Sequence, residues 1–250
     1  VDGGGWIGTT PADGSFNTSS ENFVFTTASL SEGDHMVESK ATDEATNVET
    51  SYPSISFVTD TVEPNTEIDA YTTPINTATP TYTGTATDAT TLVVYLECRI
   101  DGGSWEAATP VDGAFDSANE LYTFTTATLS DGSHYIQARS TDEAGNVETS
   151  LAYGEFVTDV TEPETEIDDF DTYITKVNSP TYITGNAQDN TTEIMNVEYR
   201  LDGGDWRQAT ASDGSFDDGI TYESYEYEAF ELTVPDVLAD GWHNVETRAY

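Results

Sequence analysis

Residues 93–105 read VVYLECRIDGGSW and indicate a β-strand that ends in a tight turn. In the first eight residues one face carries the apolar side chains Val94, Leu96, Cys98 and Ile100. An alternation with a period of two residues is typical of a strand with one buried face. The Asp-Gly-Gly that follows can adopt the positive φ angles of a tight hairpin turn.

The segment that follows this strand occurs three times in the chain. The copies read VDGGGWIGTTPADGSF from Val1, IDGGSWEAATPVDGAF from Ile100 and LDGGDWRQATASDGSF from Leu201. They start 99 and 101 residues apart. A period of about 100 residues corresponds to one β-sandwich domain and is too long for a solenoid repeat.

The sequence predicts an all-β chain of tandem Ig-like antiparallel β-sandwiches. No stretch has the 3.6-residue periodicity of a helix. With strands in immunoglobulin order, residues 61–160 form one complete domain. Residues 1–60 form a domain that lacks its N-terminal strands, and residues 161–250 form a domain that lacks its last strand. We expect further domains of the same protein, or neighbouring copies, to supply the strands that these two domains lack.

The charge of the chain excludes several classes of partner. The 250 residues include 47 acidic and 7 basic side chains, which gives a net charge of −40. Such a surface repels phosphate backbones and anionic lipid headgroups, so we expect no nucleic-acid partner. No apolar run approaches the ~20 residues that cross a bilayer, so no membrane insertion is expected in this segment. The charge suits concentrated salt or divalent cations, which screen or bridge the repulsion.

The loop STDEAGN, residues 140–146, contains acids that could bind a metal ion. In Ig topology this F–G loop, the B–C loop and the N-terminus of the domain gather at one end of the sandwich. Flexible loops can supply the carboxylate and amide oxygens that calcium takes as ligands. The sequence therefore predicts calcium at the domain junctions. The candidate ligands are Asp60, Glu63, Asp88, Asp142 and Asn146 at the first junction, and Asp159, Glu162 and Asp189 at the second.

A plain turn is the alternative for the same loop. Asp142 can cap its own turn, Gly145 can supply a positive φ angle, and Asn146 tolerates a left-handed conformation. The near-copy ATDEATN, residues 41–47, has Thr46 in place of the glycine, so glycine is not obligatory at this position. From the sequence both interpretations stay open.

No catalytic residue and no enzymatic activity are predicted. His35, His134 and His243 occupy the same position in the three repeats, which indicates a structural role. The single cysteine, Cys98, cannot form an internal disulfide, and it aligns with Tyr199 at a packing position. The basic residues also repeat, and we expect them to pair with carboxylates across the strands. They are Arg99 with Arg200, and Lys40 with Arg139 and Arg248.

Three further segments are candidates for contacts or modification. The third domain carries a Tyr- and Glu-rich insertion at residues 221–236. Its tyrosines are a candidate contact surface, because Tyr supplies contact area at low entropic cost. The alternative is a longer hairpin whose tyrosines fold back on their own sheet. These tyrosines are Tyr222, Tyr225 and Tyr227, and the two candidate glycosylation sites are Asn17 and Asn190.

The motifs IDGGSW, DGAF, LSDGSH, STDEAGN and FVTDVTEP resemble those of the bacterial and archaeal Ig-like domains that occur in tandem along large adhesins, S-layer proteins and surface filaments. The resemblance covers the whole chain. It implies a non-catalytic extracellular structural protein, a stalk, S-layer or filament subunit at the cell surface, and cations at the junctions would stiffen it. The alternatives are an adhesin or carbohydrate-binding module that binds surface glycans, or the spacer of a secreted hydrolase.

Overall fold

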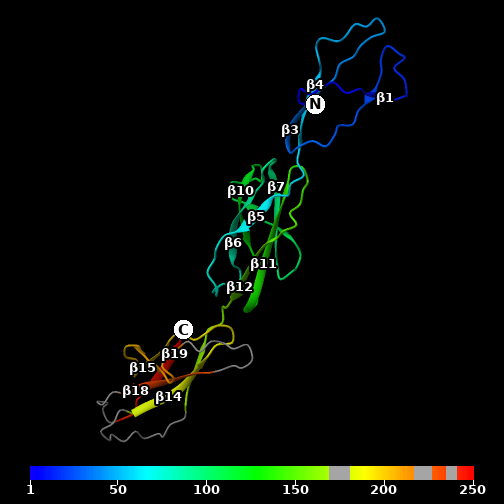
Figure 1. Cartoon of the computed structure of the whole chain (residues 1–250). Helices are drawn as coiled ribbons and strands as arrows, with labels where there is room; N and C mark the ends of the chain where they lie inside the picture. Colours follow the sequence, from blue (N-terminus) through cyan, green and yellow to red (C-terminus); the bar gives the residue numbers. More distant parts are fainter. Residues whose placement is uncertain (169–180, 217–226, 235–240) are drawn as a thin grey trace. The chain divides into compact units, whose positions relative to one another are not determined.

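Every regular element of the described chain is a β-strand (Figure 1). The structure is a computed structural model, and it describes residues 1–168, 181–216, 227–234 and 241–250. Within these residues the prediction of an all-β chain is confirmed.

Contacts along the chain define two compact units, each of which is described by itself. Unit 1 comprises residues 1–71, 81–125 and 135–154, and unit 2 comprises residues 72–80, 126–134 and 155–250. The division runs through the predicted domain at residues 61–160. The three domain ranges drawn from the sequence therefore stay a prediction.

Two four-stranded sheets form between residues 65 and 158. In the first the order is β5-β6-β10-β9, with β5 at Asn65–Ile68, β6 at Thr81–Thr87, β9 at Thr109–Pro110 and β10 at Asn119–Thr125. In the second the order is β12-β11-β7-β8, with β7 at Val93–Ile100, β8 at Glu106–Ala107, β11 at Gly132–Asp142 and β12 at Ala152–Thr158. The turn after β7 has the predicted positive φ angles, 52° at Asp101 and 68° at Gly102.

Apolar side chains from both sheets form the core. Leu96 and Cys98 of β7 are buried, and so is Tyr122 of β10. Gly84 of β6 pairs with Tyr122, and a β-carbon at Gly84 would lie 2.1 Å from the carbonyl oxygen of Glu67 and 2.7 Å from the Tyr122 ring. Any larger residue at position 84 would force β5 or the ring to move.

The predicted alternation is wrong at the start of β7. Val93 is buried and Val94 is exposed, which is the reverse of the prediction. Strand β11 pairs Thr141 with Tyr95 and Asp142 with Val93, so Val94 has no partner in the ladder. This β-bulge moves the pattern by one residue, and it turns Val93 inward beside Asp142.

Residues 1–60 form two short sheets within unit 1. One contains β1 (Thr10–Pro11) and β2 (Phe23–Val24), and the other contains β3 (Gly33–Glu38) and β4 (Ser54–Thr59). Both pairs are antiparallel. By the sequence repeat they correspond to β9, β10, β11 and β12.

Unit 2 repeats the two-sheet arrangement after residue 163. One sheet has the order β13-β14-β18-β17, with β13 at Glu164–Ile167, β14 at Thr181–Gln188, β17 at Thr210–Ala211 and β18 at Glu228–Val234. The other has the order β16-β15-β19, with β15 at Val197–Leu201, β16 at Arg207–Gln208 and β19 at Val245–Ala249. Gly185 faces Phe230 as Gly84 faces Tyr122, since a β-carbon at Gly185 would lie 2.5 Å from the Phe230 ring.

Candidate metal centre

The loop after β11 is closed by hydrogen bonds between Asp142 and Asn146. Asp142 Oδ1 accepts the backbone N–H of Asn146, and Oδ2 accepts a side-chain Nδ2–H, both at 2.8 Å. Gly145 has a φ angle of 93°, as the turn interpretation predicted. These bonds hold the carboxylate of Asp142 in one orientation at the buried end of the strand.

The first repeat forms the same closed turn. Asp43 accepts the backbone and side-chain N–H groups of Asn47, again at 2.8 Å each. These bonds, with the Asn47 side chain contributing most, lower the pKa of the Asp43 carboxyl group. Thr46 takes a φ angle of 70° in the place of the glycine. The Asp–Asn pair is therefore a turn motif in its own right, and a metal site at Asp142 needs further ligands.

Asp60, in the linker before β5, is one candidate for such a ligand. Its Oδ2 accepts the hydroxyl hydrogen of Thr91 at 2.5 Å, and its Oδ1 accepts the N–H of Val62 at 3.1 Å. The backbone carbonyl oxygen of Asp60 accepts Nδ2–H of Asn146 at 3.2 Å. The linker is thus tied to the B–C loop and to the F–G loop by the same residue.

Asp88, immediately after β6, is the second candidate. Its Oδ1 accepts the N–H groups of Thr90 and Thr91 at 2.9 Å and 2.7 Å, so this carboxylate also orients its own turn. Its Oδ2 is buried and has no hydrogen-bond partner, and the residue as a whole is 9% exposed. A buried carboxylate oxygen without a partner carries a desolvation cost that a cation or a donor would remove.

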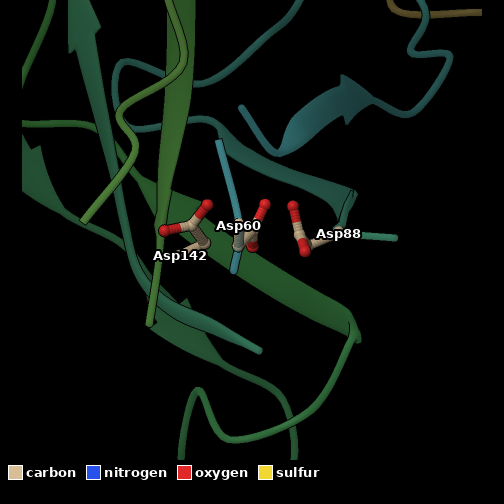
Figure 2. Close-up of side chains that lie close together, drawn as sticks. All are labelled: Asp60, Asp88 and Asp142. Carbon is tan, nitrogen blue, oxygen red and sulfur yellow. The ribbon is translucent and has the colours of Figure 1, made fainter. Parts of the chain in front are cut away.

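Asp60, Asp88 and Asp142 bring their carboxylates together. One oxygen from each lies within 4.8 Å of the others, and Figure 2 shows Asp60 between the other two. No basic side chain of the described residues forms an ion pair with any of the three. Three negative charges at this separation repel one another strongly when two of them are buried. The donor set consists of oxygens alone, which is the set that calcium and magnesium prefer.

Glu63 lies outside this cluster. Its carboxylate accepts the N–H of Thr149 at 2.6 Å and the Thr149 hydroxyl at 2.9 Å. The residue therefore ties the linker to the end of the F–G loop. Asn146 presents Nδ2, and not its oxygen, to Asp142 and Asp60.

The second junction repeats half of the first, within unit 2. Asp159 Oδ2 accepts the hydroxyl hydrogen of Thr192 at 2.5 Å, and Asp189 Oδ1 accepts the N–H groups of Thr191 and Thr192. These bonds match those of Asp60, Asp88 and Thr91. A cavity of about 90 Å³ lies here, lined by Thr161, Glu162, Glu164, Gln188, Asp189 and Asn190.

His35, His243 and Cys98 have the contacts and burial of structural residues. His35 Nδ1 lies 2.7 Å from Asp2 Oδ2, and its Nε2 lies 2.8 Å from the carbonyl oxygen of Ser31. His243 contacts Asp202 in the same way at 2.7 Å. Burial raises the pKa of the Cys98 thiol to about 12.

The basic residues lie on the repeated tryptophans. Arg99 and Arg139 lie 4.4 Å and 4.2 Å from the centre of the Trp105 ring. Arg139 also pairs with Glu97 on the neighbouring strand, as expected, at 2.6 Å. The cation–π contact was not foreseen, although the period of about 100 residues places one Trp after each turn. The other repeats form the same cation–π contact, between Trp6 and Lys40 and between Trp206 and both Arg200 and Arg248.

Sequence reasoning also missed three groups that organise the site. Thr91 and Thr192 each bridge a linker acid to a B–C loop. The spacing Asp-x-x-Thr in TDATT and QDNTT could have indicated them. Glu148 is buried, and its carboxylate accepts the N–H groups of Thr66 at 2.9 Å and Ser140 at 3.2 Å. The position of Glu148, two residues after the turn, does not indicate this role in the sequence.

The other candidate residues are described only in part. Tyr222 and Tyr225 lie outside the described residues. Tyr227 is 59% exposed immediately before β18. Asn17 and Asn190 are both exposed.

Comparisons with known proteins find similarities to one family model and to solved structures. Three solved structures are similar at low identity. A tetra-tandem repeat in the extending region of a large adhesion protein is 20% identical, with 97% of this chain and 64% of that chain covered and a TM-score of 0.31. The sulfane dehydrogenase SoxCD from Paracoccus pantotrophus is 16% identical, with 44% and 27% covered and a TM-score of 0.31. The dimeric latent PorU from Porphyromonas gingivalis is 12% identical, with 92% and 22% covered and a TM-score of 0.29.

This chain spans less than two thirds of each of these three proteins. No curated protein matches the sequence. The described residues contain no helix of the length and hydropathy that a membrane span requires. The family model of the bacterial Ig-like domain matches residues 65–161, the same residues that form β5 to β12. Residues 65–161 of this chain are therefore similar to a bacterial Ig-like domain.

Proposed function

We propose that this chain is a non-catalytic structural part of an extracellular surface protein, a stalk, S-layer or filament subunit built from Ig-like repeats. In this proposal calcium binds to Asp60, Asp88 and Asp142 and stiffens the linker. The observation that carries the proposal is the unpartnered, buried Oδ2 of Asp88 beside two further carboxylates. The Ig-like domain at residues 65–161 supports the structural role.

The geometry fits calcium. Two oxygens on one calcium ion can lie up to about 5 Å apart, because each bond measures about 2.3–2.6 Å. The corresponding limit for magnesium is about 4 Å. The three acids place one oxygen each within 4.8 Å of the others, and this bound lies inside the calcium limit. Asn146 would add a further oxygen after its side-chain amide turns to present Oδ1, and waters would supply the rest of the six to eight that calcium takes.

Binding at this place would act on the linker. Asp60 belongs to the linker, whereas Asp88 and Asp142 belong to two loops of the Ig-like domain. A cation shared by all three would fix the linker to the domain more firmly than the hydrogen bonds of Thr91 and Asn146 do. The net charge of −40 opposes compact folding through self-repulsion at low salt, and bound cations would offset part of that repulsion.

Calorimetric titration with calcium, followed by small-angle scattering, tests the proposal. We expect one binding event, a higher melting temperature and a narrower distribution of lengths in calcium than in chelator. Magnesium at the same concentration is the control for ionic strength. Identical melting temperatures and length distributions in calcium and in chelator would refute both the site and the stiffening.

A further inference from the structure

The outer face of the sheet β12-β11-β7-β8 carries arginine and aromatic side chains. Leu96 and Cys98 of β7 are buried, as are Ile136 and Ala138 of β11. Successive side chains of a strand point to opposite faces, so the residues that alternate with these four lie on the outer face. They include Arg99 of β7 and, on β11, Tyr135, Gln137 and Arg139.

Arg99 differs from the other arginines on these outer faces because no carboxylate forms an ion pair with it. Its Nε–H donates to Gln137 Oε1 at 2.8 Å, and its guanidinium lies 4.4 Å from the centre of the Trp105 ring. Among the described residues, the ion pairs that arginines form are Arg139 with Glu97, Arg200 with Glu246, and Arg248 with Glu198.

The third repeat has an acid at the position of Gln137. Arg200, the equivalent of Arg99, pairs with Glu246 and lies 4.7 Å from the centre of the Trp206 ring. In the strand ladder Glu246 is opposite Arg200, as Gln137 is opposite Arg99. The stacked arginine is therefore neutralised inside the third repeat, whereas in the second repeat it can pair with an external carboxylate.

Two tyrosines extend this face of the second repeat. The rings of Tyr135 and Tyr153 have centres 5.6 Å apart and planes tilted by 32°, and Tyr153 is 55% exposed. Tyr135 lies two residues before Gln137 on β11, which is about 7 Å along the strand. This spacing is close to the length of one pyranose ring with its exocyclic carboxylate. An exposed tyrosine ring offers an apolar surface on which the C–H face of a sugar can stack.

We propose that this face binds a sugar residue that bears one carboxylate, such as a uronic acid at the end of a glycan. Arg99 binds the carboxylate, Gln137 Nε2 is a second donor, and the two tyrosines contact the sugar ring. The net charge of −40 favours a ligand with a single negative charge, because it repels a polyanion or a second copy of the chain more strongly. The site uses none of the three clustered aspartates, so it is independent of the calcium proposal.

NMR titration of the full chain with methyl β-D-glucuronide tests this site. We expect shifts of the Trp105 indole N–H and of the Gln137 side-chain amide. Methyl β-D-glucoside, in which a hydroxymethyl group replaces the carboxylate, should cause no comparable shifts. The variant Gln137→Glu carries the acid of the third repeat, so it should keep its melting temperature and bind the glucuronide about tenfold more weakly or worse.

The matched control is Glu246→Gln, which frees Arg200 beside Trp206 in the third repeat. Asn244 is there at the position of Tyr135, so the tyrosine surface is missing. We therefore expect no glucuronide-dependent shift of the Trp206 indole in this variant.

Three results would overturn the proposal. The first is no response of the Trp105 indole to the glucuronide, or an equal response to the glucoside. The second is unchanged glucuronide affinity in Gln137→Glu. The third is a response of the same size to an oligoglutamate peptide, or of Trp206 to the glucuronide in Glu246→Gln. The arginine would then bind carboxylates of any source, and an acidic polypeptide such as a second copy would be the better partner.

Discussion

Replacement of Asp88 by Asn should change the stability of the Ig-like domain in opposite directions with and without calcium. Asn has nearly the same shape as Asp, and its Oδ1 can still accept the N–H groups of Thr90 and Thr91. Its Nδ2 would occupy the place of the unpartnered Oδ2 and could donate to Asp60 or Asp142. Without a cation the variant removes a repulsion and adds a donor, whereas with calcium it removes a ligand.

The magnitude follows from the separation of the acids. Two unit charges at most 4.8 Å apart repel by at least about 3 kcal/mol at an effective dielectric constant of about 20. Hydrogen bonds to Asp60 and Asp142 already offset part of this, so we expect Asp88→Asn to stabilise the chelated protein by about 1–3 kcal/mol. In calcium at 100 times the dissociation constant, the native protein gains about 2.7 kcal/mol that the variant would lose.

Hydrogen exchange as a function of urea, measured on peptides that cover β6 and β7, reports the stability of this domain separately from the rest of the chain. The control variant is Asp43→Asn, which loses the Oδ2 acceptor of the Asp–Asn turn in the first repeat; among the described residues Asp43 belongs to no cluster of three acids. The control should lower local protection equally in calcium and in chelator. A variant Asp88→Asn that is destabilised equally in both conditions would show that Asp88 only caps its turn.

Three further predictions follow from the core and the turns. Gly84→Ala would place a β-carbon 2.1 Å from the carbonyl oxygen of Glu67, so we expect a loss of about 1–3 kcal/mol in urea unfolding, with Gly5→Ala as a neutral control. The hydrogen bond to the Asp2 side chain raises the pKa of His35. The stabilisation from this bond is therefore complete below the unfolded pKa of about 6.5 and is lost as pH rises through the folded pKa. NMR titration should show a lower His35 pKa in Asp2→Asn. Burial raises the pKa of Cys98 to about 12, so a thiol reagent at pH 8 should label it only in denaturant.

The sequence predicted the strands well because one physical signal governs them. Alternating side chains, glycine turns and a repeat of about 100 residues all indicate the same sandwich, and β7 begins and ends within one residue of its predicted range. The bulge at Val94 was not predictable from the alternation, since a bulge depends on the pairing with β11.

The candidate site could be predicted to the level of topology but not of contacts. The Ig strand order brings the linker, the B–C loop and the F–G loop together, which is why Asp60, Asp88 and Asp142 were foreseen. Competition between hydrogen-bond partners then selects among the acids. Glu63 has a longer side chain that reaches Thr149, so it lies outside the cluster. The spacing of the residues does not predict which of several nearby donors an acid will bind.

The two interpretations of the STDEAGN loop apply to different parts of the molecule. The bond pattern of Asp142 and Asn146 recurs at Asp43 and Asn47, so it belongs to the turn and requires no ion. The convergence on Asp60 belongs to the linker. A cation site here would combine a linker acid with two loop acids that their own turns have already oriented. If calcium binds, its effect should therefore appear in the mobility of the linker, and Asp142 should keep its turn geometry when the ion is removed.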